Sequence, residues 1–202
     1  MQNLDQLSEH DIAKRLDCRG ELTHDIPLVQ PVCDYKQAGV LIPFIRVEDS
    51  WHLLYIRRAT TERDRHSGQV AFAGGKYEEY DQDMQATALR EAHEEIGVVP
   101  DDVTVLGQLG HHHSVSNFRI TPIVGHIPWP YSLTLQTDEV GRAFSIPLQW
   151  LANPANHEIR YRTLAQQKQK AAIAYFNEYD GELLWGATAR ITLSLISLLK
   201  AH

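Results

Sequence analysis

The sequence predicts one domain of the α/β or α+β class, in which helices flank a mixed β-sheet. Many short apolar runs rich in β-branched residues have the length of strands, and only two or three segments have helical periodicity. With 202 residues, 43% of them hydrophobic and 22% charged, the chain has the size and composition of one globular domain. Because no repeat, low-complexity tract or linker interrupts it, we expect residues 1–36 to add a helix and an extended connector to the domain formed by residues 37–202.

The helices are expected near both ends of the chain and in its middle. Residues 4–16 and 185–201 carry apolar side chains at helical spacing, and residues 83–96 form a third helical segment that Asp81 or Asp83 can cap. The expected strands lie at residues 38–47, 51–59, 69–75, 103–110, 119–127, 142–148, 158–162 and 172–179.

Composition excludes several classes of protein. The formal net charge of −7 argues against a general nucleic-acid binder, which usually presents a basic face. No apolar run approaches the ~20 residues of a membrane span, and residues 1–16 lack the pattern of a signal peptide. Cys18 and Cys33 are too few for a disulfide framework. We therefore expect a cytoplasmic protein without nucleic-acid or membrane partners; a homodimer is compatible with the sequence.

Negative charge is concentrated on one side of the helix at 83–96. Glu91, Glu94 and Glu95 fall within an arc of about 100°, because residues three and four apart are neighbours on a helix. These carboxylates repel one another, lie near the helix C-terminus where the dipole disfavours them, and follow the glycines at 74–75. A hard divalent cation such as Mg²⁺ would relieve the repulsion and bind substrate phosphates. The alternative is an ordinary solvated helix face.

The residues around this helix resemble a known family. The stretch "REAHEEIGV" (90–98) has the Arg-Glu-apolar-x-Glu-Glu-x-Gly-apolar pattern and resembles the core of the Nudix box of diphosphate hydrolases. The stretches "HSGQVAFAGGK" (66–76), "TALREA" (87–92) and "WGATARI" (185–191) resemble the coenzyme A diphosphatase branch of these proteins. The resemblance extends from about residue 37 to residue 198.

The resemblance implies a Nudix-type α/β/α sandwich with a mixed sheet, and a function for each residue of the motif. Its glutamates would bind Mg²⁺ or Mn²⁺, with Glu91 and Glu95 as ligands and Glu94 as a further ligand or water-positioning group. The backbone carbonyl of Gly75 would be the remaining ligand from the protein. Arg90 would orient a glutamate through a bidentate ion pair.

Two positions depart from the pattern of the branch. Ala73 stands where the branch has the proline of "FPGG", and Asp64 stands where it has an arginine. Either Arg63 or Arg65, which flank this aspartate, substitutes for that arginine, or the substrate preference differs from that of the branch. Asp81 occupies the place of the branch's own acid, one residue off the spacing of the general Nudix box.

Three further groups are candidates for the site. Glu139 lies in a late loop from which Nudix proteins often supply an extra acid, either as a metal ligand or as a base. The three consecutive histidines at 111–113 can converge on zinc only if the strand bends there, so a polar loop near the pocket or a substrate contact is favoured over a zinc site. A basic run before the Gly-Gly turn is either a solvated face or a binding site for substrate phosphates, at Arg57, Arg58, Arg63 and Arg65.

The expected reaction is the metal-dependent hydrolysis of a diphosphate bond in a small molecule that links a nucleoside diphosphate to another group. With coenzyme A, the resemblance implies 3′,5′-ADP and 4′-phosphopantetheine as products. Another Nudix substrate, such as ADP-ribose, NADH or a dinucleotide, is the first alternative. A Nudix-fold module that binds a nucleotide without cleaving it is the second, and the intact set Glu91, Glu94 and Glu95 argues against it.

Overall fold

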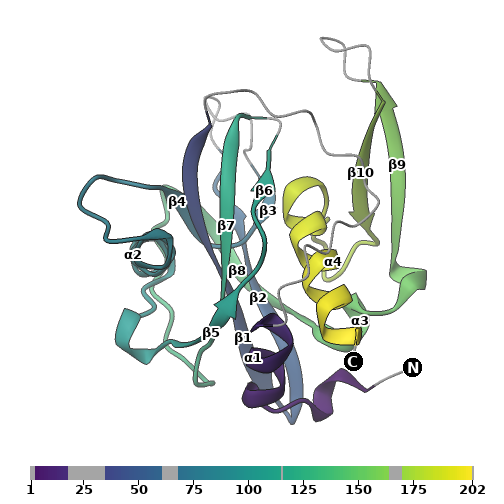
Figure 1. Cartoon of the computed structure of the whole chain (residues 1–202), viewed down its shortest axis with the longest axis horizontal. Helices are drawn as coiled ribbons and strands as arrows, with labels where there is room; N and C mark the ends of the chain where they lie inside the picture. The colour runs from purple at the N-terminus through teal and green to yellow at the C-terminus, as the bar shows by residue number, and fades with distance from the viewer. Residues whose placement is uncertain (1–2, 18–34, 61–67, 115, 164–169, 202) are drawn as a thin grey trace.

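All structural statements below concern the residues that the computed structural model describes, which are 3–17, 35–60, 68–114, 116–163 and 170–201. Both cysteines, the expected connector, and Arg63, Asp64 and Arg65 lie outside them. The described chain forms one large sheet with helices on both faces and a small two-stranded sheet beside it (Figure 1).

The large sheet is mixed, as the sequence predicts, because one parallel pair of strands stands among antiparallel pairs. β1 (Lys36–Val47) runs parallel to β7 (Phe118–His126) and antiparallel to β2 (Ser50–Arg58). The other strands are β3 (Val70–Ala71), β4 (Gly74–Lys76), β5 (Thr104–Gln108), β6 (His112–His113) and β8 (Val140–Pro147). The order is β3-β2-β1-β7-β5, with β4 on β1, β6 on β7 and β8 on β2.

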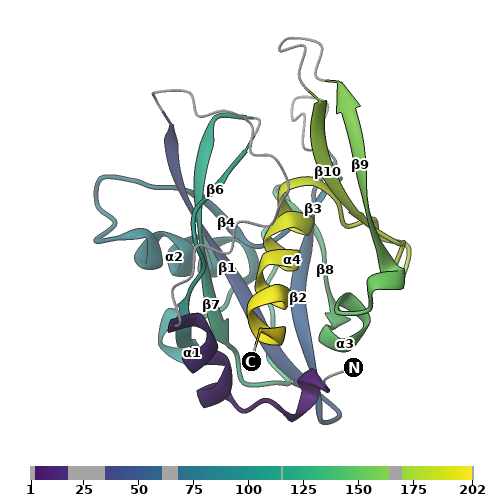
Figure 2. The same cartoon turned by 45° about the vertical axis from the view of Figure 1, so that its right-hand side comes forward.

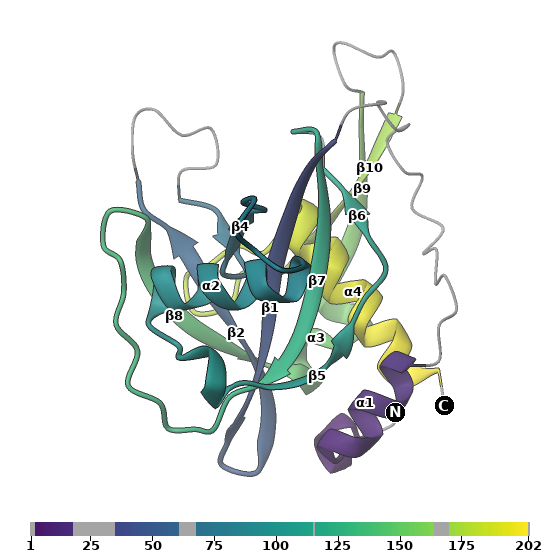
Figure 3. The same cartoon turned by 60° about the vertical axis from the view of Figure 1, so that its left-hand side comes forward.

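β1 changes its partner along its length, and this divides the sheet at one end. Residues 44–47 of β1 pair with β2, whereas residues 38–40 pair with β4. The hairpin between β1 and β2 turns at Glu48 and Asp49, whose φ angles of 46° and 65° are those of a tight type I′ turn. From this hairpin the two strands diverge (Figure 3). The start of β1 and the end of β2 therefore face each other across the divided end of the sheet.

Helices complete an α/β/α arrangement, which confirms the predicted fold class. α2 (Met84–Ile96) packs on one face of the sheet, and α1 (Glu9–Asp17) and α4 (Gly186–Lys200) pack on the other (Figures 1 and 3). Side chains alternate along a strand, so β1 contributes to both cores. It presents Leu41 and Ile45 to α2, and Ile42 and Phe44 to the opposite core.

The smaller elements extend the α4 side. β9 (His157–Thr163) and β10 (Lys170–Phe176) pair antiparallel and stand beside α4, away from the large sheet (Figure 2). The chain reaches them through the short helix α3 (Leu148–Leu151) and a 3-10 turn, η3 (Pro154–Asn156). Another 3-10 turn, η2 (Pro100–Asp102), joins α2 to β5.

Three expected elements differ from the structure. The strand expected at 69–75 is divided into β3 and β4, because the residues between them carry the chain from the edge of β2 to the edge of β1. The polar loop expected at the histidines includes β6. The helix expected at 4–16 is a 3-10 turn, η1 (Leu4–Gln6), followed by α1. α1 begins after Ser8, because Ser8 and Asp11 each accept a hydrogen bond from the other's backbone N–H.

The N-terminal residues 3–17 are part of the core. Trp51 of β2 donates its indole N–H to the Leu7 carbonyl at 2.8 Å, and its backbone N–H donates to Asp5 Oδ1 at 2.8 Å. The Arg46 guanidinium lies 4.0 Å from the Trp51 ring centroid and donates to the Asp5 carbonyl. The side chains buried by this segment are Leu4, Leu7, Ile12 and Leu16. The segment therefore covers the face of the sheet opposite α2.

This packing predicts that the N-terminal segment stabilises the whole domain. Ile12→Ala should lower the free energy of unfolding by about 2–5 kcal/mol, because it leaves a cavity in the core at a side chain that is fully buried. Lys14→Ala on the exposed side of the same helix is the control and should change it by less than about 0.5 kcal/mol. Equal values for the two variants in urea denaturation would show that α1 does not contribute to the cooperative core.

Candidate active site

Local sequence determines where α2 begins and ends. Asp83 is the N-cap, and its side chain accepts a 2.8 Å hydrogen bond from the Ala86 backbone N–H. Gly97 ends the helix in the left-handed conformation at φ 74°, and its N–H donates to the His93 carbonyl. The apolar side of the helix packs on the sheet through Ala88, Ala92 and Ile96. This orientation turns the acidic side toward the glycine turn that precedes the helix.

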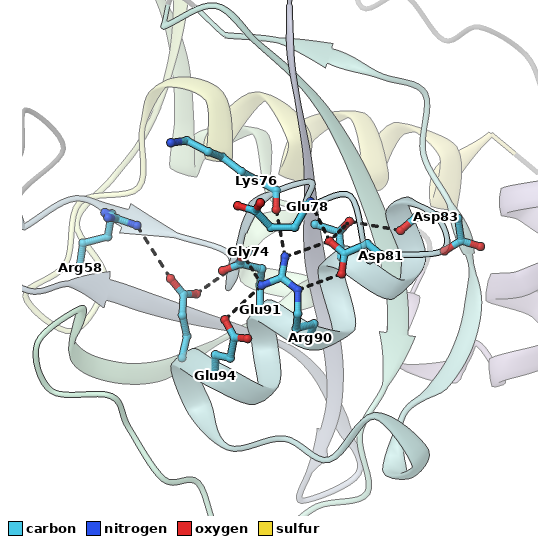
Figure 4. Close-up of polar contacts among 11 residues, drawn as sticks. Arg58, Gly74, Lys76, Glu78, Asp81, Asp83, Arg90, Glu91 and Glu94 are labelled. Atoms are coloured by element: carbon cyan, nitrogen blue, oxygen red, sulfur yellow. Dashed lines mark hydrogen bonds and ion pairs between the residues drawn. The ribbon is translucent and has the colours of Figure 1, made fainter.

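Arg90 is the centre of the polar contacts in this region (Figure 4). Its Nε and Nη2 lie 2.9 and 3.0 Å from the two carboxylate oxygens of Asp81. Its Nη1 lies 2.9 Å from Glu91 Oε1 and 3.1 Å from Glu94 Oε2, and Nη2 also donates to the Lys76 carbonyl at 3.0 Å. The bidentate partner of Arg90 is thus an aspartate, whereas the sequence led us to expect a glutamate. The glutamates receive single hydrogen bonds instead.

Asp81 is the residue that sequence reasoning understated. Besides Arg90, it accepts hydrogen bonds from the Glu78 backbone N–H at 3.0 Å and from the Thr87 hydroxyl at 2.9 Å. These donors, above all the Arg90 guanidinium, hold the pKa of Asp81 at about 2, although burial acts in the opposite direction. The sequence already showed that Asp81 occupies the position of an acid that precedes the motif. Its bidentate contact with Arg90 depends on the path of the loop at 77–83.

Glu95 is buried, with 2% of its surface exposed. Its Oε2 accepts a 2.9 Å hydrogen bond from the Gly74 backbone N–H, and its Oε1 lies 3.9 Å from Arg58 Nη1 (Figure 4). Burial raises the pKa of Glu95 to about 7, while the Gly74 N–H and Arg58 act to lower it. The negative charges of Glu91 and Glu139 raise it further. The site therefore holds a carboxylate whose charge is poorly compensated by the protein.

Glu91 packs directly against Gly75 of β4. A Cβ atom at Gly75 would lie 2.4 Å from the Glu91 carboxyl group, so the carboxyl group keeps this position only while residue 75 is glycine. Burial raises the pKa of Glu91, and the charges of Glu94 and Glu139 add to this effect, while Arg90 opposes it. Glu139 itself is exposed, and its carbonyl accepts a 2.7 Å hydrogen bond from the Ala59 N–H just beyond β2. These acids thus share one electrostatic environment.

The structure separates the two described arginines of the basic run. Arg58 faces α2 and lies near Glu95. Arg57 faces the opposite side of the sheet, where its Nη1 lies 3.3 Å from Glu182 Oε1. The two are adjacent in a strand, so their side chains point to opposite faces. Alternation along the strand expected at 51–59 is enough to separate them, and the structure adds which carboxylate each one faces.

The histidines and Trp185 take structural positions. His111 Nδ1 lies 3.0 Å from the Thr121 hydroxyl, and its Nε2 lies 2.6 Å from Arg119 Nη2. His112 and His113 form β6, so their side chains alternate. Trp185 precedes α4 and stacks on Tyr175 with ring centroids 5.7 Å apart.

Comparison with known proteins agrees with this geometry. A sequence model of the NUDIX domain matches residues 35–168. The chain belongs to the Nudix hydrolase family. An uncharacterized Nudix hydrolase, NudL, from Pectobacterium atrosepticum is 39% identical over 166 residues, which cover 82% of this chain and 83% of the relative. NudL of Yersinia pestis is 40% identical, over 77% of this chain and 76% of the relative.

The fold has solved counterparts. A MutT/nudix family protein from Enterococcus faecalis superposes with a TM-score of 0.50 at 11% identity, and the match covers 94% of this chain and 73% of that one. This likeness concerns the fold alone. This Nudix hydrolase is thus an enzyme of a family that acts on diphosphate bonds in nucleoside-diphosphate-linked substrates. None of the described helices is long and apolar enough to cross a membrane.

Nudix hydrolases generally use divalent metal ions, and part of this site fits one. Glu91 and Glu95 are hard oxygen donors whose burial and mutual repulsion favour a nearby cation. Glu94 is half-exposed and contacts Arg90. Within the described ranges, no three side chains of His, Cys, Asp or Glu are gathered into a metal-binding group. Glu95 is buried and Glu91 is partly buried beside Gly75, so these two carboxylates are the part of the site whose charge a cation would balance.

The depressed pKa of Asp81 predicts a pH-dependent contribution to stability. A carboxyl group whose pKa is about 2 in the folded protein and ~3.9 in the unfolded chain contributes stability above pH 4, and this contribution is lost as the pH falls from 4 to 2. Asp81→Asn should therefore lower the free energy of unfolding by roughly 1–3 kcal/mol at pH 7. The difference from the wild type should shrink through that window.

Urea denaturation at several pH values measures this difference. Asp101→Asn, at an exposed acid of η2, is the control and should stay within about 0.5 kcal/mol of the wild type at every pH. A difference for Asp81→Asn that is constant between pH 7 and pH 2 would contradict the assignment.

The contact between Gly75 and Glu91 predicts that adding one methyl group at residue 75 strongly lowers kcat. Gly75→Ala should reduce kcat at least about tenfold, because the new Cβ displaces the Glu91 carboxyl group. Gly110→Ala is the matched control, since a Cβ there meets nothing within 4 Å. Unchanged kcat in a folded Gly75→Ala protein would show that the position of Glu91 is unimportant for turnover.

Proposed function

We propose that this Nudix hydrolase cleaves the diphosphate bond of coenzyme A or its acyl derivatives, giving 3′,5′-ADP and (acyl-)4′-phosphopantetheine. The observation that supports it most is the contact of Glu91 and Glu95 with Gly74 and Gly75, which lie within the "HSGQVAFAGGK" stretch that resembles the coenzyme A diphosphatase branch. The acidic chain with two cysteines fits a cytoplasmic enzyme with a small-molecule substrate.

Each residue of the site has its own role in the proposed reaction. Glu91, Glu95 and the Gly75 carbonyl would hold Mg²⁺ or Mn²⁺, with Glu94 as a further ligand or water-positioning group. The ion, when bound, neutralises the diphosphate and lowers the pKa of a water molecule. Arg90 keeps Glu91 and Glu94 in place, since it contacts both while Asp81 holds its guanidinium.

Proton transfer is assigned to an acid outside the helix. Glu139 is exposed and close enough to Glu91 and Glu95 to influence both, so its carboxylate can accept the proton of the attacking water. That water then attacks a phosphorus atom in line with the leaving oxygen. Arg58 beside Glu95 supplies positive charge to the phosphates on the same face of the sheet.

A substrate panel tests the choice of coenzyme A. The purified protein is incubated with Mg²⁺ or Mn²⁺ and coenzyme A, ADP-ribose, NADH or dinucleoside polyphosphates, and the products are separated by chromatography. We expect kcat/KM to be highest for coenzyme A, with 3′,5′-ADP as a product. Cleavage of ADP-ribose or NADH without cleavage of coenzyme A would refute the substrate while leaving the diphosphatase intact.

Glu95→Gln tests the assignment of the buried carboxylate. Glutamine keeps an acceptor for the Gly74 N–H but loses the negative charge, so we expect kcat to fall by at least about 100-fold without loss of the fold. Glu79→Gln, at an exposed loop residue, is the control and should retain wild-type kcat. Near-normal turnover of Glu95→Gln with its best substrate would refute its role as a ligand.

A further inference from the structure

A second charged cluster lies on the sheet face opposite α2. Arg57 of β2 and Arg142 of β8 are directly opposite each other in the ladder. Both guanidinium groups reach the same oxygen of Glu182, with Nη1–Oε1 distances of 3.3 Å for Arg57 and 3.1 Å for Arg142. The cluster therefore joins two strands of the sheet to the segment that leads into α4.

The pairing of two arginines across a ladder requires an explanation, because like charges directly opposite each other destabilise a sheet. Glu182 is buried, with 5% of its surface exposed, and balances one of the two positive charges. The other is balanced by Asp180, which contacts Arg142 and whose side chain is 62% exposed. One of the two carboxylates thus lies on the solvent side, where an anion of higher charge can replace it.

The geometry of the cluster is set in advance. Glu182 and Tyr179 exchange backbone hydrogen bonds of 2.9 and 3.0 Å across a tight turn. Asp180 and Gly181 in this turn have φ angles of 51° and 77°, as a type I′ turn requires. The side chains of Arg57 and Arg142 remain 43% and 36% exposed. Two oriented and accessible guanidinium groups suit the oxygens of a phosphate.

The cluster lies at the same end of the same strand as the active site. Arg57 and Arg58 are consecutive, so their Cα atoms are about 3.8 Å apart, yet Arg57 faces Glu182 while Arg58 faces Glu95. β3 and β8 pair with β2 on either side of Arg57, and β2 ends at Arg58. One elongated substrate that passes around this end of the strand can place its diphosphate at the glutamates and extend a second anionic group toward Arg57.

We propose that Arg57, Arg142 and Glu182 form a binding site for a phosphate monoester of the substrate, remote from the diphosphate that is cleaved. Arg57 and Arg142 contact the phosphate, Glu182 is a positioning residue that holds both guanidinium groups, and Asp180 is displaced. This inference rests on the proposed function, because coenzyme A carries such a phosphate on the 3′ position of its ribose. ADP-ribose and NADH carry none.

The test compares coenzyme A with 3′-dephospho-coenzyme A, which differ only in this phosphate. We expect the wild type to have a KM for coenzyme A at least about tenfold lower than for the dephospho form. Arg142→Gln should abolish this preference by raising KM for coenzyme A, while kcat and KM for the dephospho form stay unchanged. Arg160→Gln, at an exposed arginine of β9 paired with Glu158, should retain the preference.

Asp180→Asn distinguishes a binding site from a structural ion pair. Removing the competing carboxylate should lower KM for coenzyme A several-fold and leave the dephospho form unaffected, whereas a purely structural pair would give no gain. Equal KM values of the wild type for the two substrates, or an equal effect of Arg142→Gln on both, would overturn the inference and leave the proposed function standing.

If the proposed function is wrong, the experiments give a different result, and the anion site can still be tested. If the wild type cleaves neither form, calorimetry with 3′,5′-ADP and metal-free protein tests the anion site by itself. Binding that Arg142→Gln weakens at least about tenfold would support the site. Binding of equal strength in both proteins, or no binding to the wild type, would refute it.

Discussion

The hydrogen bonds of Arg90 connect the parts from which the active site is built. One guanidinium group contacts Asp81 in the loop before α2, the Lys76 carbonyl at the end of β4, and two glutamates of the helix itself. The planar, forked shape of the group allows it to serve several acceptors at once with fixed directions. Because Asp81 is in turn held by the Glu78 N–H and the Thr87 hydroxyl, the loop cannot shift without moving the glutamates.

The site concentrates negative charge that the protein only partly neutralises. Arg90 brings a single positive charge to Asp81, Glu91 and Glu94, and Glu95 lies in a buried position with one backbone N–H and a guanidinium at 3.9 Å. Burial and neighbouring acids raise the pKa values of Glu91 and Glu95, which shows that their charged forms are disfavoured in the protein alone. A divalent cation would balance the negative charge of these acids and would also bind the negatively charged substrate. The free-energy cost of burying several acids together is therefore consistent with a site that binds both.

The divided sheet explains how one strand can serve two charged regions. β1 leaves β2 for β4, and the loop between β3 and β4 brings Gly74 and Gly75 to the helix. At the end of β2, consecutive arginines face Glu95 on one side and Glu182 on the other. The N-terminal segment packs on the α1–α4 side at the hairpin end, through Arg46 and Trp51, and supports the fold away from the site.

The sequence by itself determined the features that depend on neighbouring residues. The many short apolar runs predicted a mixed sheet between helices, and helical spacing placed Glu91, Glu94 and Glu95 on one side of α2. The Arg-Glu-apolar-x-Glu-Glu-x-Gly pattern was enough to predict the Nudix family, which the comparisons confirm. Each of these signals depends on residues that are close together in the sequence.

Only the tertiary structure decided which of these residues meet. Asp81, rather than a glutamate, is the bidentate partner of Arg90, because the fold of the loop at 77–83 brings it there. The burial of Glu95 depends on Gly74 arriving from another strand, and the partners of Arg57 and Arg58 depend on which segments cover the two faces of the sheet. Glu182 reaches Arg57 from 125 residues away in the chain. Such contacts arise from the path of the whole chain, which no local pattern of residues records.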